Sequence, residues 1–306
     1  MPSDARELGQ FIPAHYHANM LNDEARMRGF YEAITRVVPQ GGKVVELGGG
    51  TGVLSFFAAQ RAAQVWCVEF NPELVALSRS LLAQNQNGHR VEVVHADAST
   101  WLPPAPVDVV VCEMLHTGLL REQQAAVLHS FKQGYLARFG GPLPRFVPEA
   151  CLQAIQPIEQ NFVHEGYYAP CLQFQSPVAQ QQRSVELGPP TVYQAFCWDE
   201  TIPNSCSFDG PVAVNRDGQV NALRVITKNL LAIVDQSQRT IDWHNQYMIV
   251  PLDVPIDVVA GDALAVSFEY SPGAALSALR KSLTVVRQVA DAVADSERAG
   301  ASVTST

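Results

Sequence analysis

A glycine-rich loop between a short apolar strand and a helix constrains this chain more than any other feature. Residues 43–47 (KVVEL) form a continuous apolar run typical of a buried parallel strand, and the next five residues read GGGTG. Gly48, Gly50 and Gly52 alternate in this loop, where glycine lets the backbone turn tightly and approach a ligand closely. The pattern predicts a ligand-binding unit of strand, loop and helix.

An acidic residue just before the loop narrows the choice of ligand. A dinucleotide-binding loop reads Gly-x-Gly-x-x-Gly and faces a pyrophosphate, whereas the glycines here are one residue closer together. Glu46 would repel a pyrophosphate, but it would attract an amino group or a sulfonium. The loop therefore favours a cationic cofactor over a nicotinamide dinucleotide.

The first half of the chain alternates between strand and helix patterns. After a helix at 21–38, we expect strands at 43–47, 65–70, 91–95 and 107–113 and helices at 51–62, 72–85 and 121–137. Such alternation indicates a doubly wound parallel sheet, so we predict an α/β, Rossmann-like domain at residues 1–145.

The pattern changes after about residue 140, where prolines become frequent and helical periodicity fades. We expect strands at 149–156, 191–198, 221–235, 246–252, 263–270 and 283–288. These predict a β-barrel or sandwich domain at residues 146–289. Residues 290–306 contain few bulky apolar side chains and are predicted to be a flexible tail.

Two further acids follow the next strands of the predicted sheet. Glu69 lies at the end of the second strand, where a carboxylate can accept hydrogen bonds from both hydroxyls of a ribose. Asp97 follows the third strand, where it can accept from an adenine amino group. With Glu46 and the glycines, this set resembles the S-adenosyl-L-methionine site of the class I methyltransferases, and the resemblance implies that cofactor.

The segment after the fourth strand resembles a narrower family. Residues 112–122 read CEMLHTGLLRE and place Glu113 and Glu122 nine positions apart. Together with HANMLNDEAR at 17–26, this resembles the double-glutamate loop of the protein arginine methyltransferases, with features of their divergent members. The resemblance covers about residues 11–290 and implies a methyltransferase domain followed by a β-barrel that helps to bind the acceptor.

Paired glutamates suit a guanidinium acceptor. A guanidinium stays protonated in proteins and delocalises its electrons, so none of its nitrogens is a free nucleophile. Two carboxylates can hold the positive charge on part of the group and orient another nitrogen toward the methyl donor. We therefore assign Glu113 and Glu122 to catalysis.

The family resemblance implies roles for further residues. Arg26 matches an arginine that binds the cofactor carboxylate, and Met20 matches a methionine beside the cofactor. Asp23 and His244 match an acid–histidine pair of the acceptor pocket, although Trp243 and His244 in TIDWHNQ are transposed relative to the family loop. In this family a dimerisation arm mediates homodimer formation, and residues 157–205 are shorter than that arm or differ from it in sequence. A homodimer is therefore left as an open expectation.

Composition excludes several other classes of protein. A net charge of −9 and a pI near 5.3 argue against nucleic-acid binding and suit a cationic partner. Apolar runs are too short for a membrane span, and the first residues do not resemble a secretory signal. The six cysteines lack metal-ligand spacing, so we expect reduced thiols, no metal and a cytoplasmic location.

The acceptor itself stays open at this point. A protein arginine, free arginine and related small guanidino metabolites all satisfy the pattern. Two alternatives remain: a natural-product methyltransferase acting on another amine or a hydroxyl, and a non-catalytic cofactor-binding protein that uses the barrel for docking.

Overall fold

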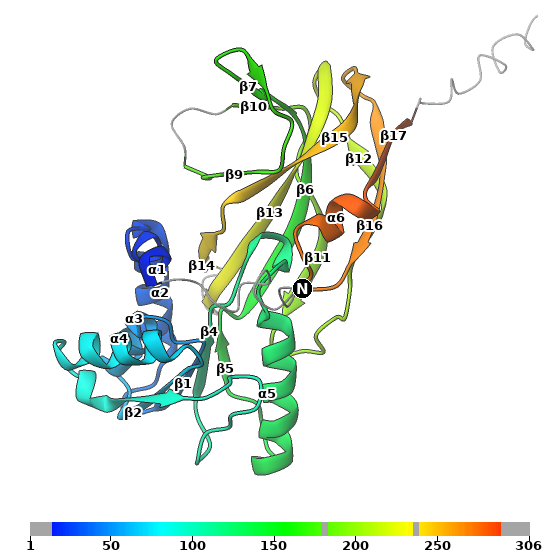
Figure 1. Cartoon of the computed structure of the whole chain (residues 1–306). Helices are drawn as coiled ribbons and strands as arrows, with labels where there is room; N and C mark the ends of the chain where they lie inside the picture. Colours follow the sequence, from blue (N-terminus) through cyan, green and yellow to red (C-terminus); the bar gives the residue numbers. More distant parts are fainter. Residues whose placement is uncertain (1–13, 179–182, 235–238, 289–306) are drawn as a thin grey trace, which may run out of the picture.

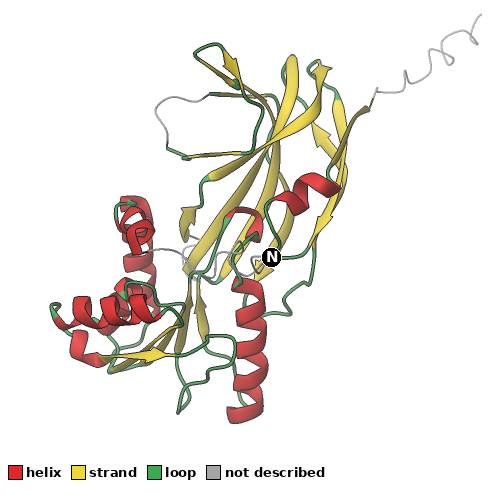
Figure 2. Cartoon of the chain, viewed as in Figure 1, coloured by secondary structure: helices red, strands yellow, loops and turns green. Residues whose placement is uncertain are grey.

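The computed structural model describes residues 14–178, 183–234 and 239–288, arranged as an α/β unit followed by a β-rich unit (Figure 1). Helices are concentrated in the first unit and long strands in the second (Figure 2). The predicted tail at 290–306 lies outside the described residues. No helix in the described ranges is long and apolar enough to cross a membrane.

The first unit is built on a five-stranded parallel sheet with the order β3-β2-β1-β4-β5. The strands are β1 (Lys43–Leu47), β2 (Gln64–Glu69), β3 (Val91–His95), β4 (Val109–Cys112) and β5 (Arg145–Val147). The three central strands are almost wholly buried, which explains their continuous apolar sequences. The predicted doubly wound sheet is confirmed, and its last strand ends two residues beyond the expected boundary at 145.

Five helices surround this sheet. They are α1 (Ala14–Leu21), α2 (Glu24–Val37), α3 (Val53–Ala59), α4 (Pro72–Ala83) and α5 (Gln124–Phe139). A break at Asp23 separates α1 from α2: the Asp23 backbone is extended, and its Oδ1 accepts a hydrogen bond from the Arg26 N–H at 2.9 Å. Helix α2 packs on α3 and also on β13 and β14 of the second unit, so it contributes to both units.

The second unit contains a seven-stranded antiparallel sheet and a three-stranded one. The larger sheet comprises β6 (Ala150–Gln160), β9 (Gln173–Gln175), β10 (Ser184–Glu186), β11 (Thr191–Cys197), β13 (Gly218–Val234), β14 (Arg239–His244) and β15 (Tyr247–Val258). The smaller sheet comprises β12 (Cys206–Ala213), β16 (Ala263–Tyr270) and β17 (Thr284–Gln288). In the chain, the helix α6 (Ser277–Ser282) connects β16 to β17. This arrangement agrees with the predicted β-rich second domain.

Within residues 157–205, the segment expected to differ from the family's dimerisation arm, the chain forms a short hairpin and then returns to the larger sheet. Its strands β7 (Val163–His164) and β8 (Tyr167–Tyr168) pair only with each other, whereas β9 pairs with β15. Tyr167 and Tyr168 are exposed on the hairpin. Homodimer formation stays a prediction.

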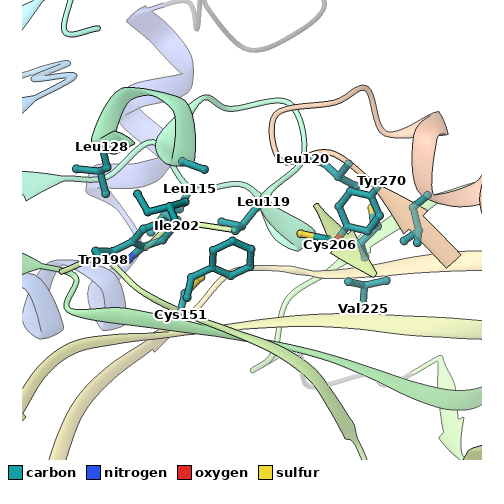
Figure 3. Close-up of a cluster of buried hydrophobic side chains, with 14 of the residues drawn as sticks. Leu115, Leu119, Leu120, Leu128, Cys151, Trp198, Ile202, Cys206, Val225 and Tyr270 are labelled. Atoms are coloured by element: carbon teal, nitrogen blue, oxygen red, sulfur yellow. The ribbon is translucent and has the colours of Figure 1, made fainter. Parts of the chain in front are cut away.

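The loop after β4 joins the two units through a shared apolar core. Leu115, Leu119 and Leu120 are buried against Trp198 and Tyr270, which come from the second unit (Figure 3). Burying large apolar side chains is the main favourable contribution to such packing. The loop that carries the two predicted catalytic glutamates is therefore held between the units.

All six cysteines are free thiols, and four of them are buried.

Candidate active site

The glycine loop has the backbone conformation that its sequence predicted. Gly48, Gly50 and Gly52 have φ values of +78°, +54° and +78°, which side chains with a Cβ rarely adopt. A Cβ on Gly48 would lie 2.9 Å from the Met114 side chain, and one on Gly50 would lie 2.8 Å from the His17 ring. The loop therefore needs glycine both for its conformation and for its close neighbours.

Glu46 contacts the first turn of the helix that follows the loop. Its Oε2 accepts a hydrogen bond from the Ser55 N–H at 2.8 Å and another from the Ser55 hydroxyl. Burial raises the pKa of Glu46 to about 8, although the bonds from Ser55 act in the opposite direction. Glu46 thus organises the start of α3 and also lines the cavity described below.

Glu69 is the last residue of β2, and Asp97 lies two residues after the neighbouring parallel strand β3, as expected. The two Glu69 oxygens accept hydrogen bonds from the Gly50 and Asn71 N–H groups, both at 2.8 Å. Asp97 Oδ1 accepts from the Ser99 N–H at 2.8 Å and from its hydroxyl at 2.7 Å. These backbone donors orient both carboxylates, and an ionised carboxylate has about four acceptor positions, so capacity for ligand hydroxyls and amino groups remains.

One cavity of about 740 Å³ connects the glycine loop with the double-glutamate loop. Ten of the twelve predicted site residues line it: Met20, Asp23, Arg26, Glu46, Gly48, Gly50, Glu69, Asp97, Glu113 and Glu122. The other two, Gly52 and His244, do not. Gly52 instead forms the N-cap of α3. Residues from α1, α2 and the ends of four strands therefore meet at the carboxyl edge of the parallel sheet, the usual position of ligands in such folds.

Arg26 and Glu113 form an ion pair in the middle of this cavity. The pair joins Arg26 Nη2 to Glu113 Oε2, and the two side chains are only 7% and 8% exposed. The Arg26 guanidinium also lies over the rings of Phe30 and Trp243, at 5.4 and 5.9 Å from their centroids. The Arg26 Nε is buried without a hydrogen-bond partner among the described residues. The expected contact of Arg26 with a cofactor carboxylate stays a prediction.

The second glutamate of the pair lies in an unfavourable setting for a negative charge. Burial, followed by the nearby Glu113 carboxylate, raises the pKa of Glu122 to about 8. Two acids kept close together in a cavity stabilise a cation that binds between them. The pair therefore provides an electrostatic reason for binding a cationic group.

The predicted contact between Asp23 and His244 is wrong. Asp23 Oδ2 accepts a hydrogen bond from Trp243 Nε1 at 3.2 Å, and Trp243 lines the cavity. His244 lies beside Lys228 and Asp242, and burial and Lys228 lower its pKa. The reason is that TIDWH is the strand β14 and not a loop, so successive side chains point to opposite faces.

Three further cavity residues were not assigned to the site from the sequence. His17 covers Gly50, and its Nε2 is buried without a partner among the described residues. Phe174 of β9 packs edge-to-face on His116, with ring centroids 5.2 Å apart. The one sequence signal that pointed to His17 as a site residue was its position just before the MLND segment. No sequence signal pointed to Phe174 or His116, because their contact depends on how β9 pairs with β15.

The described residues fit S-adenosyl-L-methionine. Gly48 and Gly50 of the glycine loop line the cavity, and Glu69 and Asp97 provide acceptors at the sheet edge. Arg26 is the one Lys or Arg side chain among the described residues that line the cavity. Two buried side-chain nitrogens of this lining have no hydrogen-bond partner in the described part of the chain, Arg26 Nε and His17 Nε2. This donor and acceptor set suits a ligand with ribose, amino and carboxylate groups.

Comparisons with known proteins agree with this description. Residues 44–134 match the family described as a methyltransferase domain. An uncharacterized protein of Methanocaldococcus jannaschii is 24% identical over 269 residues, which cover 88% of this chain and 96% of that protein. The arginine N(omega)-methyltransferase of Streptomyces achromogenes subsp. streptozoticus is 34% identical over 113 residues, which cover 35% of this chain and 31% of that enzyme.

A solved structure shows the same fold over most of the chain. The protein arginine methyltransferase 10 of Arabidopsis thaliana superposes with a TM-score of 0.70 at 19% identity, covering 86% of this chain and 89% of that one. Residues 44–134 therefore form a methyltransferase domain, which implies S-adenosyl-L-methionine as the cofactor, and the two-unit fold of the chain is similar to that of the protein arginine methyltransferases.

Proposed function

We propose that this chain is an S-adenosyl-L-methionine-dependent N-methyltransferase that acts on a guanidino group. The observation that carries the proposal is the position of Glu113 and Glu122 in the same cavity as the glycine loop and Glu69. One cavity thus has a cofactor end and an acidic acceptor end. The bound cofactor supplies an electrophilic methyl group on its sulfonium.

The residues at the cofactor end divide the work of binding. Arg26 provides the positive charge for a carboxylate, Glu69 accepts from the ribose hydroxyls, and Asp97 accepts from the adenine amino group. Gly48 and Gly50 would line the bound cofactor with backbone alone, because both lie in the cavity wall and carry no side chain. Met20 also lines the cavity.

The charge of the cavity supports a cationic acceptor. Its described lining includes six acidic side chains, and Arg26 is the one Lys or Arg side chain there. Even with Glu46 and Glu122 protonated, because their pKa values are raised to about 8, four acids face this one cation. The ion pair between Arg26 and Glu113 supports this proposal, because a guanidinium is already a partner of the Glu113 carboxylate. Glu113 and Glu122 would hold the acceptor's charge and orient the reacting nitrogen. After transfer, Glu122 or water would accept the released proton.

Incubation with methyl-labelled cofactor tests the proposal. An arginine-containing peptide and free arginine serve as separate acceptors, and mass spectrometry locates the label. We expect label on guanidine nitrogens with the wild-type chain and its loss in Glu113→Gln and Glu122→Gln. The exposed Glu165 provides the matched control, because Glu165→Gln alters a distant hairpin.

The other outcomes of this experiment refute the proposal in different ways. Label on a hydroxyl or a non-guanidine amine, with none on guanidine, would identify a different acceptor class. Cofactor binding without turnover on either acceptor, or on a wider pool of amines and hydroxyls, would identify a non-catalytic protein.

A further inference from the structure

One buried glutamine connects the two ends of the double-glutamate loop. Gln124 is the first residue of α5 and is 1% exposed. Its side-chain Nε2 donates to the Cys112 carbonyl at 2.8 Å, and its Oε1 accepts from the Met114 N–H at 2.9 Å. Cys112 and Met114 are the residues on either side of Glu113, so a single amide group holds the backbone on both sides of that glutamate.

The same glutamine is linked to the other glutamate through the chain. Glu122 lies two residues before Gln124, at the entrance to α5. The amide of Gln124 therefore ties the end of β4, which carries Glu113, to the start of α5, which follows Glu122. The separation and direction of the two carboxylates depend on this connection.

The loop between the glutamates needs such support because its backbone is strained. Leu119 and Arg121 have φ values of +53° and +64°, which are rare for residues with a side chain. The barrel holds the middle of the loop: the Gly118 N–H donates to Thr227 Oγ1 at 2.8 Å, and the Arg121 N–H donates to the Ala274 carbonyl at 2.8 Å. These contacts lie between the glutamates, whereas Gln124 holds the backbone at Glu113 itself.

We infer that Gln124 is a positioning residue that fixes Glu113 relative to Glu122, and this inference rests on the proposed function. Both bonds are needed, and an amide side chain has one group that donates and one that accepts. A carboxylate in its place only accepts, and a thioether of similar length does neither. Gln124 acts on the backbone and needs no contact with the acceptor.

Two variants of similar shape test the inference. Gln124→Met and Gln124→Leu each remove the bond to the Cys112 carbonyl and the bond from the Met114 N–H. A misplacement of about 1 Å costs up to about 100-fold in rate, so we expect kcat for guanidine methylation to fall about 10- to 100-fold in both. The Kd for S-adenosylhomocysteine, measured by calorimetry, should stay within about twofold, since Gln124 does not line the cavity.

A matched control separates positioning from a general loss of stability. Gln156 is also a buried glutamine, 3% exposed, whose amide donates to the Gly188 carbonyl and accepts from Arg224, both at 2.9 Å. It lies in the barrel and does not line the cavity. Gln156→Met should lower the melting temperature by a similar amount as Gln124→Met, with kcat within about twofold of wild type.

The outcomes distinguish this inference from the proposed function. If the wild type methylates guanidine and both Gln124 variants retain kcat within about threefold, the inference fails while the proposed function stands. An equal fall of kcat in Gln156→Met and Gln124→Met would also overturn it, because stability alone would then explain the loss. If the wild type binds cofactor but methylates no guanidine, the proposed function fails.

Discussion

Replacement of Glu122 by glutamine should make the protein more stable and inactive, and the gain in stability should grow with pH. Burial, followed by Glu113, raises the pKa of Glu122 in the folded protein from its usual value of 4.5 to about 8. The unfolded chain releases this proton near the usual value. Between these two pH values the folded state therefore binds more protons than the unfolded state, so stability falls as pH rises through this window.

The size of the effect follows from the same pKa difference. At pH 7 the wild-type chain loses about 3 kcal/mol of stability relative to acid pH on account of Glu122, at 1.36 kcal/mol per pH unit. Glu122 lines a cavity that water can enter, which reduces this figure, and we expect about 1–3 kcal/mol. The amide in Glu122→Gln does not titrate, so the variant escapes this loss.

Chemical denaturation at pH 5 and pH 8 measures the difference. The free energy of unfolding of Glu122→Gln should match wild type within about 1 kcal/mol at pH 5 and exceed it by about 1–3 kcal/mol at pH 8. The exposed Glu165→Gln variant should differ from wild type by less than about 0.5 kcal/mol at both values. In parallel, wild-type kcat/KM for a guanidinium acceptor should rise with pH and reach half of its plateau value near pH 8, as Glu122 ionises.

Two results would refute this reasoning. A stability gain that is the same at pH 5 and pH 8 would mean that Glu122 does not titrate between them in the folded chain. A variant that is less stable than wild type at pH 8 would mean that the folded protein favours the ionised carboxylate.

Three further predictions follow from the contacts around the cavity. Asp23→Ala removes the N-cap of α2 and the acceptor for the Trp243 indole, so urea denaturation should give a loss of about 1–3 kcal/mol, of which Asp23→Asn restores the capping part. Gly50→Ala places a Cβ against the His17 ring at a positive φ, and calorimetry should find cofactor affinity reduced at least about 10-fold with an unchanged circular dichroism spectrum. Steady-state kinetics should separate the two residues of the transposed pair: His244→Ala, outside the cavity, should keep kcat/KM within about twofold, and Trp243→Ala, in its wall, should lower it at least about 10-fold.

The cofactor end of the cavity could be predicted because its signals are local. A strand ending in glycines must turn, and Glu69 and Asp97 directly follow strands whose carboxyl ends share one edge of a parallel sheet. Spacing along the chain is then nearly equivalent to position in space. All that the structure added there was how the acids are held, for example Glu46 on Ser55.

The acceptor end was harder to predict because strand register decides it. Residues 240–246 were interpreted as a loop, which allowed His244 to face Asp23. As a strand, the same residues alternate between faces, and a change of one position exchanges Trp243 for His244. The pairing of β14 with β13 brings the Trp243 indole to the start of α2. The local sequence carries no signal for the register of that pairing.

The sequence by itself determined the alternation of strands and helices in the first unit, the glycine turn, and the placement of Glu46, Glu69, Asp97 and Glu113 at or near strand ends. These features depend on periodicity and on residues close together in the chain. Only the tertiary structure decided which atoms meet: Trp243 with Asp23, Arg26 with Glu113, and Gln124 with the backbone around Glu113. Such contacts are set by the packing of two units against each other and by sheet register. A shift of a few ångströms makes or breaks a hydrogen bond, and a local sequence pattern does not specify atomic positions to that precision.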